Sequence, residues 1–437
     1  MKTVIMAGGA GTRISEVFPD IPKPLIPICG VPVLEREITG LKEQGFDDII
    51  LTLSHMADQI ISYFGDGSKL GVRLDYYVEQ TPLGNAGALY EIKDRLSDDF
   101  LLLNADTVFD VDFNRFFAFH KKKGGLATLF THPNNHPYDS GLIVADRDLA
   151  VRQWYAKEDT RPQYYKNRVN AGLHVIAKEL IGKRPETEKV DLDRQLLKPL
   201  SGSGQMFCYD SPEYVRDMGT KERYENVCRD FASGKVSGRN LRHKQRAIFL
   251  DRDGTINRYV GFLRSPDAFV LEANAAEAIR RINDSDYLAI VVTNQPVIAR
   301  GEVTSQALDE IHNKMETLLG QEGAYLDGLY FCPHHPDKGF AGEIASLKTE
   351  CECRKPKPGM LLQAAGDFHI DLASSWMVGD GTNDILAGIN AGTKTGRIIT
   401  DRTEDQAKSN LCGKDLLDVV TQILSFHDFE NNKERRT

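Results

Sequence analysis

The chain of 437 residues has 41% hydrophobic residues, 27% charged residues and a formal net charge of −9. Its length predicts two or three domains, and its composition is that of a soluble globular protein. The negative charge and the lack of a dense basic stretch exclude a general nucleic-acid binder. No apolar run approaches the roughly 20 residues of a membrane span, and no signal-peptide core precedes the first strand, so we predict a cytoplasmic protein without membrane contact.

The cysteines point to the same compartment. There are seven of them, an odd number, and four are scattered singly, as expected in a reducing environment without a disulfide framework. The other three, Cys332, Cys351 and Cys353, lie near one another in the sequence. The sequence leaves the oligomeric state open, a homo-oligomer included.

Strand-length apolar runs alternate with helix-length amphipathic segments along the whole chain. An amphipathic helix is predicted over 33–45. The apolar residues of the strands are continuous rather than alternating, which is typical of buried parallel strands in an α/β protein. In the first half, strands are predicted over 3–7, 48–53, 100–105, 127–132, 172–177 and 205–210.

The alternating pattern stops over 222–244, where a charged, mostly polar run predicts a helix and then a Ser/Gly linker. The two halves share no motif, so we predict a fusion of unlike domains, 1–222 and 245–437, joined by a helix and linker over 223–244. The stretch 401–437 is predicted as a polar loop, an amphipathic helix around LLDVVTQIL and a frayed tail. Strands of the second half are predicted over 247–251, 287–294, 329–332, 375–380 and 395–400.

The segment MAGGAGTR (6–13) follows the first predicted strand. Its glycines let backbone N–H groups approach an anion closely, although the same pattern also occurs in tight turns. It lacks the GK[ST] ending of a P-loop. The continuation favours a phosphate site, because Arg13 and then Lys23 in PKPL can neutralise a triphosphate.

GGAGTR…PKPLIPICGVPVLE resembles the opening of the sugar-1-phosphate nucleotidyltransferases. The resemblance covers 1–222 and implies a three-layer αβα, Rossmann-like domain that joins a sugar 1-phosphate to a nucleoside triphosphate and releases pyrophosphate. The nearest resemblance is to the mannose- and heptose-1-phosphate guanylyltransferases, so GTP is the expected donor, with ATP and CTP left open. Five later segments follow the same family in order: TPLGNAGAL, NAD, WYAKED, NAGLHVI and YVRDMGT.

The resemblance also implies the roles of individual residues. Lys23 and Arg13 would offset charge on the transferring phosphoryl group, and Lys157 would pair with the sugar phosphate. Asp106 and Asp217 would jointly hold one Mg²⁺, an ion that prefers oxygen ligands; taken alone, Asp106 could equally cap a turn. The remaining implied nucleotide- and substrate-binding residues are Gly8, Gly9, Gly11, Thr12, Gly84, Asn85, Asn170 and Gly172.

In the second half, AIFLDRDGTIN (247–257) places two carboxylates at a strand end. Continued extension would aim Asp251 and Asp253 the same way, and Gly254 permits a turn after them. Such a pair can hold a cation, and one aspartate can attack phosphorus while the other acts as general acid and base. A DxD at a strand end is by itself also a common turn or metal pattern.

Three further segments, VVTNQ (291–295), CRKPKPG (353–359) and MVGDGTND (377–384), follow in order. Together with LDRDGTIN they resemble the motifs of the haloacid dehalogenase superfamily of phosphatases, which again implies an αβα domain. The resemblance makes Asp251 the nucleophile and Asp253 the general acid/base. It also implies charge neutralisation by Lys355, phosphate contacts from Thr293, Asn294 and Gln295, and Mg²⁺ on Asp251, Asp253 and Asp380, with Asp384 a turn later.

Cys332, His334, Cys351 and Cys353 are three thiolates and one imidazole, a set that suits tetrahedral zinc. Their pairs are spaced more tightly than in common zinc fingers, and four reduced side chains on a polar loop are the alternative. His335 competes with His334 for the imidazole position.

The layout CPHHP…CxCRKPxPGM resembles the capless phosphatases that act on heptose 1,7-bisphosphate, and their histidinol-phosphate relatives. The resemblance implies a structural zinc and a substrate pocket lined by Tyr259, Val260, Gly261, Phe262 and Arg354. The chain departs from this pattern at Pro296 and Gly381, which bears on the substrate more than on the reaction.

The fusion predicts two consecutive reactions. The second domain would remove the distal phosphate of heptose 1,7-bisphosphate, and the first would activate the resulting heptose 1-phosphate, giving a nucleoside-diphosphate heptose for surface polysaccharide or lipopolysaccharide. Two alternatives stay open. The first domain could be a silent regulatory module or a mannose-1-phosphate guanylyltransferase, and the phosphatase could act on histidinol phosphate or another phosphomonoester.

Overall fold

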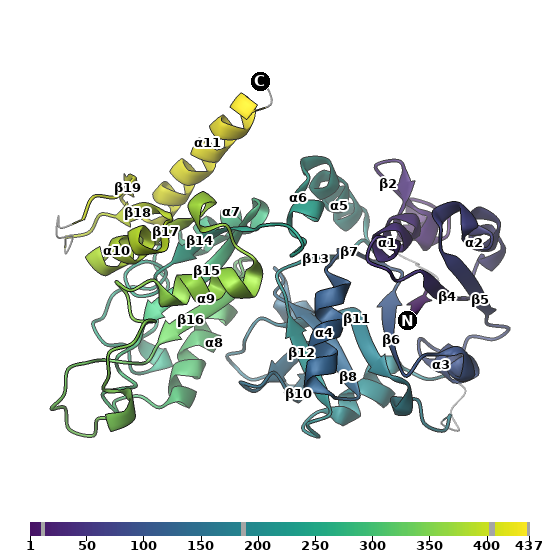
Figure 1. Cartoon of the computed structure of the whole chain (residues 1–437), viewed down its shortest axis with the longest axis horizontal. Coiled ribbons are helices and arrows are strands. Elements are labelled where there is room, and N and C mark those ends of the chain that lie inside the picture. Colours follow the sequence, from purple (N-terminus) through teal and green to yellow (C-terminus); the bar gives the residue numbers. More distant parts are fainter. Residues whose placement is uncertain (10–13, 185–188, 402–406, 435–437) are drawn as a thin grey trace. The chain divides into compact units, whose positions relative to one another are not determined.

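The computed structural model of the chain describes residues 1–9, 14–184, 189–401 and 407–434 (Figure 1). By their contacts, these residues form two compact units. The first unit comprises residues within 1–132, 140–159 and 168–240, and the second comprises residues within 133–139, 160–167 and 241–437. Both units are mixed α/β structures, as the sequence predicts.

The first unit contains a nine-stranded sheet. Its strands are β1 (Lys2–Met6), β4 (Asp48–Leu53), β5 (Arg73–Val78), β6 (Asp99–Asn104), β8 (Ala127–His132), β9 (Leu142–Ala145), β10 (Val151–Tyr155), β11 (Val169–Ala177) and β12 (Met206–Asp210). The order is β10-β9-β11-β6-β1-β4-β5, and β8 pairs with β11 and β12. Strands β1, β4, β5 and β6 are parallel, as predicted, whereas β11 runs antiparallel to β6 and β8.

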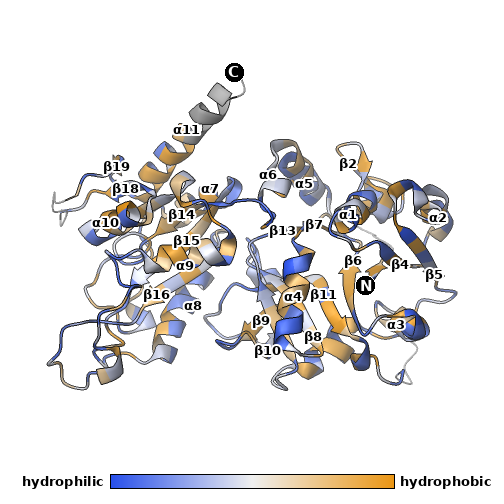
Figure 2. Ribbon diagram, in the orientation of Figure 1, coloured by the Kyte–Doolittle hydropathy of each residue, from blue (hydrophilic) through white to orange (hydrophobic). Residues whose placement is uncertain are grey.

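Helices cover both faces of this sheet. Neighbouring residues of a strand point to opposite faces, so each central strand packs against helices on both sides. Ile5 of β1 packs into a core with residues of α1, α2 and α4, whereas Val4 packs on the other side with residues of α3. Figure 2 shows the central strands in the hydrophobic colour. The helices of this unit are α1 (Val33–Lys42), α2 (Ala57–Phe64), α3 (Gly87–Glu91), α4 (Phe113–Lys123), α5 (Lys221–Ser233) and α6 (Lys235–Gly238).

Two short pairings complete the first unit: β2 (Pro27–Ile28) with β3 (Val31–Pro32), and β7 (Thr107–Asp110) with β13 (Tyr214–Asp217). The predicted helix after residue 222 is α5, which begins where the Thr220 side chain accepts a hydrogen bond from Arg223 N. It ends at Gly234, which is left-handed at φ +82°. The predicted Ser/Gly linker then forms the short helix α6 instead of an open connection.

The second unit contains a six-stranded parallel sheet in the order β16-β15-β14-β17-β18-β19. These strands are β14 (Arg246–Leu250), β15 (Tyr287–Asn294), β16 (Gly328–Cys332), β17 (Trp376–Gly379), β18 (Lys394–Ile398) and β19 (Leu411–Gly413). Its helices are α7 (Ala275–Asp284), α8 (Ser305–Gln321), α9 (Gly359–Phe368), α10 (Thr382–Ala391) and α11 (Leu416–Glu434). Strand β19 was not predicted, and α11 continues to Glu434 where a frayed tail was expected.

The second unit is also a three-layer αβα structure. Ile248 and Leu250 of β14 pack with α7, α8 and α11, whereas Ala247 and Phe249 pack with α9 and α10. Among the helices that the structure describes, none combines the length and the apolar content needed to cross a membrane.

The parallel sheet explains how distant motifs meet. Strand β14 lies between β15 and β17, and the carboxyl ends of parallel strands lie at one edge of the sheet. Asp251 follows β14, Asn294 ends β15 and Asp380 follows β17 closely. The second unit therefore brings these motifs to a common edge.

Candidate active sites

The acidic pair of the first unit is assembled by strand pairing. Asp106 precedes β7, and the antiparallel register of β7 with β13 sets Asp217 opposite Thr107. The Lys23 ammonium lies 3.4 Å from Asp106 Oδ2 and 3.5 Å from Asp217 Oδ1. Three residues predicted for one centre are thus brought together from three separate parts of the sequence.

Asp217 is held in its charged form. Burial raises its pKa, but the Lys23 ammonium, the Gly219 N–H at 2.6 Å and the Arg223 guanidinium together bring the pKa below its ordinary value. Asp106 remains largely exposed beside it. Two oxygen-bearing side chains open to solvent fit the preference of Mg²⁺ for a few carboxylates together with substrate phosphates and water.

Glu37 is a residue of this region that the sequence analysis missed. It lies on α1, is 3% exposed, and neither carboxylate oxygen has a hydrogen-bond partner. Burial and the charge of Asp106 raise its pKa well above the ordinary value, against the effect of Lys23. The periodicity contained a signal, because residue 37 shares the buried face of the helix with Leu34, Ile38 and Leu41.

The glycine-rich loop is described only in part. Gly8 and Gly9 follow β1, and Gly9 lines a small cleft with Lys23, His55 and Met56. The predicted phosphate ligands Gly11, Thr12 and Arg13 lie outside the described residues.

Gly84 and Asn85 fix a loop against residues 190–192. Gly84 is left-handed at φ +82°, and a Cβ there would lie 2.4 Å from the Val190 carbonyl oxygen. Asn85 Oδ1 accepts a hydrogen bond of 2.7 Å from Leu192 N. The Asn85 side-chain amide oxygen therefore has a structural partner in addition to the binding role predicted for this residue.

The other residues predicted to bind substrate or nucleotide lie on or near β10 and β11. Gly172 is left-handed at φ +76°, and a Cβ there would lie 2.5 Å from Asn104 Nδ2. Asn170 Oδ1 is within hydrogen-bond distance of Gly172 N and His174 Nε2. Lys157 is exposed in the turn after β10.

The acidic cluster of the second unit surrounds Lys355. The Lys355 ammonium lies 2.7 Å from Asp251 Oδ1 and 2.6 Å from Asp384 Oδ1, and donates to the Val292 carbonyl oxygen at 2.8 Å. Carboxylate oxygens of Asp251, Asp380 and Asp384 lie within 4.8 Å of one another. The structure therefore groups three predicted residues, Asp251, Lys355 and Asp380, with Asp384.

The charged groups of this cluster shift one another's pKa values. Burial and the charge of Asp384 raise the pKa of Asp251 to about 7, with Asp253 adding to the effect and Lys355 opposing it. Burial lowers the pKa of Lys355, but Asp251 and Asp384 outweigh it and bring the pKa above its ordinary value. Three carboxylates around one ammonium leave excess negative charge, so this donor set fits a hard divalent cation such as Mg²⁺.

Asp384 was noted in the sequence but given no role. It stands in the first turn of α10, where its Oδ2 accepts a hydrogen bond of 3.0 Å from Gly381 N. A Cβ at Gly379 would lie 2.3 Å from that same oxygen, so only glycine leaves room for Asp384 beside the end of β17. The signal was a second aspartate one helical turn after Asp380.

Asp253 is arranged differently from the prediction of a metal-holding carboxylate. Its side chain is outside the group formed by Asp251, Asp380 and Asp384. It accepts hydrogen bonds from Arg252, Asn257 and Gln295. The two aspartates of the DxD motif therefore have different surroundings. The chain turns directly after Asp253, at Gly254, which has φ +84°.

The polar residues at the end of β15 bond mainly to the protein. Asn294 Nδ2 donates to the Lys355 carbonyl oxygen, and Lys355 N donates to Asn294 Oδ1, both at 3.0 Å. Thr293 is buried, and its hydroxyl oxygen lies 2.9 Å from Gln295 Nε2. Asn294 thus fixes the backbone that carries Lys355.

The predicted wall of the substrate pocket is an exposed aromatic segment. Tyr259, Val260 and Phe262 are exposed, and Gly261 between them has φ +74°. The guanidinium of Arg300 lies 4.1 Å from the centre of the Phe262 ring. In a separate contact, Arg354 donates to the His334 carbonyl oxygen at 3.3 Å.

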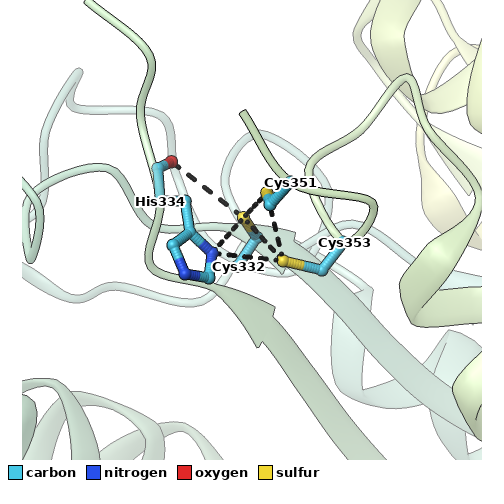
Figure 3. Close-up of side chains that lie close together, drawn as sticks. All are labelled: Cys332, His334, Cys351 and Cys353. Carbon is cyan, nitrogen blue, oxygen red and sulfur yellow. Dashed lines mark hydrogen bonds between the residues drawn. The ribbon is translucent and has the colours of Figure 1, made fainter. Parts of the chain in front are cut away.

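Cys332, at the end of β16, converges with His334, Cys351 and Cys353 from the loop region that follows (Figure 3). The three sulfur–sulfur distances are 3.2, 3.3 and 3.5 Å, and His334 Nδ1 lies 3.3 and 3.7 Å from two of the sulfurs. A zinc–sulfur bond of about 2.3 Å gives a tetrahedron edge of about 3.8 Å, whereas a disulfide needs about 2.05 Å. The cluster therefore fits a zinc ion and not a disulfide.

His335 is not part of this group. Its Nδ1 accepts a hydrogen bond of 3.2 Å from Asp337 N, and its ring packs edge-on against Phe340. Of the two adjacent histidines, the structure gives the position beside the three thiols to His334.

Comparisons with known proteins divide the chain in the same order. The family model described as nucleotidyl transferase matches residues 2–233, and the model described as HAD-hydrolase-like matches residues 352–422. The D-glycero-beta-D-manno-heptose-1,7-bisphosphate 7-phosphatase of Yersinia pestis is 43% identical over 167 residues, which are 37% of this chain and 87% of that protein. The chain belongs to the nucleotidyl transferase family in its first half and to the family of these phosphatases in its second.

Two further relatives are similar to the two halves. The protein of the same name from Haemophilus ducreyi is 39% identical over 186 residues, 41% of this chain and 98% of that protein. The crystal structure of HddC from Yersinia pseudotuberculosis complexed with GMP-PN is 28% identical, covers 53% of this chain and 99% of that one, and has a TM-score of 0.46. The prediction of an enzyme that joins a transferase to a phosphatase is confirmed by the family matches.

Proposed function

We propose that the chain converts a heptose bisphosphate into a nucleotide-activated heptose. The phosphatase half would remove the C7 phosphate of D-glycero-D-manno-heptose 1,7-bisphosphate, and the transferase half would join the heptose 1-phosphate to a guanylyl group from GTP. One observation carries this proposal: a half that is 43% identical to a phosphatase named for that bisphosphate shares a chain with a nucleotidyl transferase. The product of the first reaction is a sugar 1-phosphate, the substrate class implied for the second.

In the phosphatase half, Asp251 is the proposed nucleophile. Its carboxylate oxygen attacks the C7 phosphorus, the bond from phosphorus to the sugar oxygen breaks, and the sugar oxygen takes a proton from Asp253. Water then splits the aspartyl phosphate, returning the Asp251 carboxylate and releasing inorganic phosphate. The contact of 2.7 Å between Lys355 Nζ and Asp251 supports these roles, because the ammonium orients the nucleophile and offsets its charge.

Asp251, Asp380 and Asp384 would hold Mg²⁺, which supplies positive charge between an anionic nucleophile and an anionic ester. Tyr259, Val260, Gly261, Phe262 and Arg354 are proposed to contact the sugar. Cys332, His334, Cys351 and Cys353 would hold a structural zinc that fixes the loop leading to Arg354 and Lys355.

In the transferase half no protein nucleophile is needed. The phosphate of the sugar attacks the α-phosphorus of the triphosphate, and pyrophosphate leaves. Asp106 and Asp217 would hold Mg²⁺, with Lys23 and Arg13 offsetting charge on the phosphates. The choice of GTP rests on the resemblance of the sequence motifs to guanylyltransferases. The proposed domains are 1–222 and 245–437, joined over 223–244.

A product assay tests the proposal. The purified chain is incubated with heptose 1,7-bisphosphate, Mg²⁺ and each of the four nucleoside triphosphates in turn, and the products are identified by mass spectrometry. We expect inorganic phosphate, pyrophosphate and GDP-heptose, with GTP giving the most product. Phosphate release without any sugar nucleotide would contradict the coupled function. In a parallel assay with histidinol phosphate in place of the bisphosphate, faster phosphate release would contradict the sugar assignment.

A further inference from the structure

Asp253 is held by a set of buried side chains that the proposed mechanism has not yet used. Arg252 Nη2 donates to both carboxylate oxygens of Asp253, at 3.0 and 2.8 Å. Asn257 Nδ2 donates to Oδ1 at 3.1 Å, and Gln295 Nε2 donates to Oδ2 at 2.9 Å. All of these partners are N–H donors, so they orient Asp253 as a deprotonated carboxylate, the form that can accept a proton.

Arg252 is unusual because its side chain is 0% exposed. A buried guanidinium requires acceptors for its N–H groups, and Asp253 supplies the charged one. His312 of α8 supplies another, with Nε2 lying 3.1 Å from Arg252 Nη1. Burial and the charge of Arg252 bring the pKa of His312 well below its ordinary value, so the neutral ring can accept this hydrogen bond.

Gln295 joins the end of β15 to the same carboxylate. It is buried, and its Nε2 lies 2.9 Å from Asp253 Oδ2 and 2.9 Å from the Thr293 hydroxyl. An amide NH₂ has two N–H groups, and these two contacts use both. Gln295 therefore has no side-chain donor left for a phosphate oxygen, which was the role that the sequence implied for it.

We propose that Gln295, Arg252 and His312 are positioning residues that orient Asp253 to take a proton from the water that splits the aspartyl phosphate. The proposal rests on the proposed phosphatase function. In that step the water oxygen attacks phosphorus and the bond from phosphorus to the Asp251 oxygen breaks, returning its electron pair to the carboxylate. The proton of the water passes to Asp253.

The two chemical steps respond differently to the loss of this set. An ester with a good leaving group, such as p-nitrophenyl phosphate, releases its alcohol as an anion and needs no acid in the first step. Hydrolysis of the aspartyl phosphate needs a base for every substrate. Misplacing Asp253 therefore slows the second step with p-nitrophenyl phosphate, and the aspartyl phosphate accumulates.

The test is a rapid-mixing experiment on the full-length chain with Mg²⁺ and p-nitrophenyl phosphate. For Gln295→Leu we expect a burst approaching one p-nitrophenolate per chain, followed by a steady rate about 10- to 100-fold below that of the unchanged chain. His312→Leu, which acts through Arg252, should give the same burst with a smaller loss of rate. Gln245→Leu is the matched control, because Gln245 is equally buried in the same unit and bonds to His243 instead.

Other outcomes separate the two proposals. Equal loss of burst and steady rate in Gln295→Leu, or no change in either, would overturn the positioning role. Failure of the unchanged chain to release any p-nitrophenolate or inorganic phosphate would instead overturn the proposed phosphatase function. If Gln295→Leu yields little folded protein, Gln295→Met keeps the side-chain length without the donors, and the unfolding temperature of the second unit, measured by calorimetry, reports whether that unit is folded.

Discussion

The acidic pair of the transferase half is open to solvent, whereas the acidic cluster of the phosphatase half is closed. Asp106 and Asp217 are 59% and 38% exposed, while Asp251 and Lys355 are 14% and 2% exposed. A carboxylate that only holds a cation keeps its charge most easily in water. A carboxylate that attacks phosphorus, as proposed for Asp251, needs a fixed orientation and fewer competing waters.

Burial also changes how the carboxylates of each centre are paired with cations. Among the residues that the structure describes, the exposed pair contacts the cations of Lys23 and Arg223. The closed cluster must satisfy every buried charge, so Lys355 bridges two carboxylates and Arg252 is fully enclosed beside Asp253. The comparison predicts that damage to each centre stays local, and that the closed centre is sensitive to much smaller structural changes.

Among substitutions that test the difference between the two centres, the largest effect is expected at the open pair. Asp106→Ala removes one of the two carboxylates proposed for Mg²⁺ and should lower nucleotidyl transfer by about 1,000-fold. Phosphate release by the same preparation should stay within about twofold, since surface substitutions have small structural effects. Asp75→Ala is the control, because Asp75 is also a half-exposed aspartate with a lysine nearby. Loss of both activities together would show that the two centres are not independent.

A single added methyl group should damage the closed cluster. Gly379→Ala places a Cβ 2.3 Å from Asp384 Oδ2 and must displace the carboxylate that contacts Lys355. We expect phosphate release to fall by about 100-fold, with nucleotidyl transfer unchanged. Gly366→Ala in α9 is the control, because a Cβ there meets nothing within 4 Å. Full phosphatase activity in Gly379→Ala would mean that Asp384 is dispensable.

Removal of one proposed zinc ligand should affect the second unit alone. Cys351→Ser should reduce the zinc content from about one ion per chain to near zero and lower the unfolding temperature of that unit by several degrees. Metal analysis and calorimetry measure the two effects, with the exposed Cys412→Ser as control. A purified chain that contains no zinc but has full phosphatase activity would contradict a structural zinc.

The smallest effect concerns a buried histidine of the first unit. Burial lowers the pKa of His174 to about 3, from an ordinary value of 6.5. The unfolded chain binds the proton below pH 6.5 while the folded chain does not, so stability falls as the pH drops from 6.5 towards 3, by up to about 1.4 kcal/mol per pH unit. Urea unfolding at pH 7 and pH 5 measures this, and His174→Gln should flatten the dependence. An equal slope in the variant would assign the pH dependence to other groups.

Much of the fold and part of each site followed from local patterns. Continuous apolar runs predicted the central strands, and Asp251 and Asp380 were expected at strand ends because motifs follow those strands directly. The direction of β11 was not predictable, since burial on both faces gives the same apolar run in either direction. Asp106 and Asp217 were paired only through the family resemblance, because the register of β7 with β13 joins residues far apart in sequence.

Residues that were missed, or whose contacts differ from those predicted, depend on three-dimensional packing. Glu37 appeared as one position of an amphipathic helix, and only its burial without a partner distinguishes it. Asp253 and Gln295 carried roles from their motifs, but the turn at Gly254 and the burial of Arg252 decide what their side chains contact. A motif indicates which residues are near a reaction, whereas the hydrogen bonds show how each one is held.

The central claim is that two separate centres act in sequence on one sugar. Its most direct test is Asp251→Asn, supplied with GTP and Mg²⁺ and with either heptose 1,7-bisphosphate or heptose 1-phosphate. We expect the sugar nucleotide from the bisphosphate to fall by more than about 10,000-fold, while the 1-phosphate gives the full amount. Undiminished sugar nucleotide from the bisphosphate, or a product of the unchanged chain that retains the C7 phosphate, would contradict the claim.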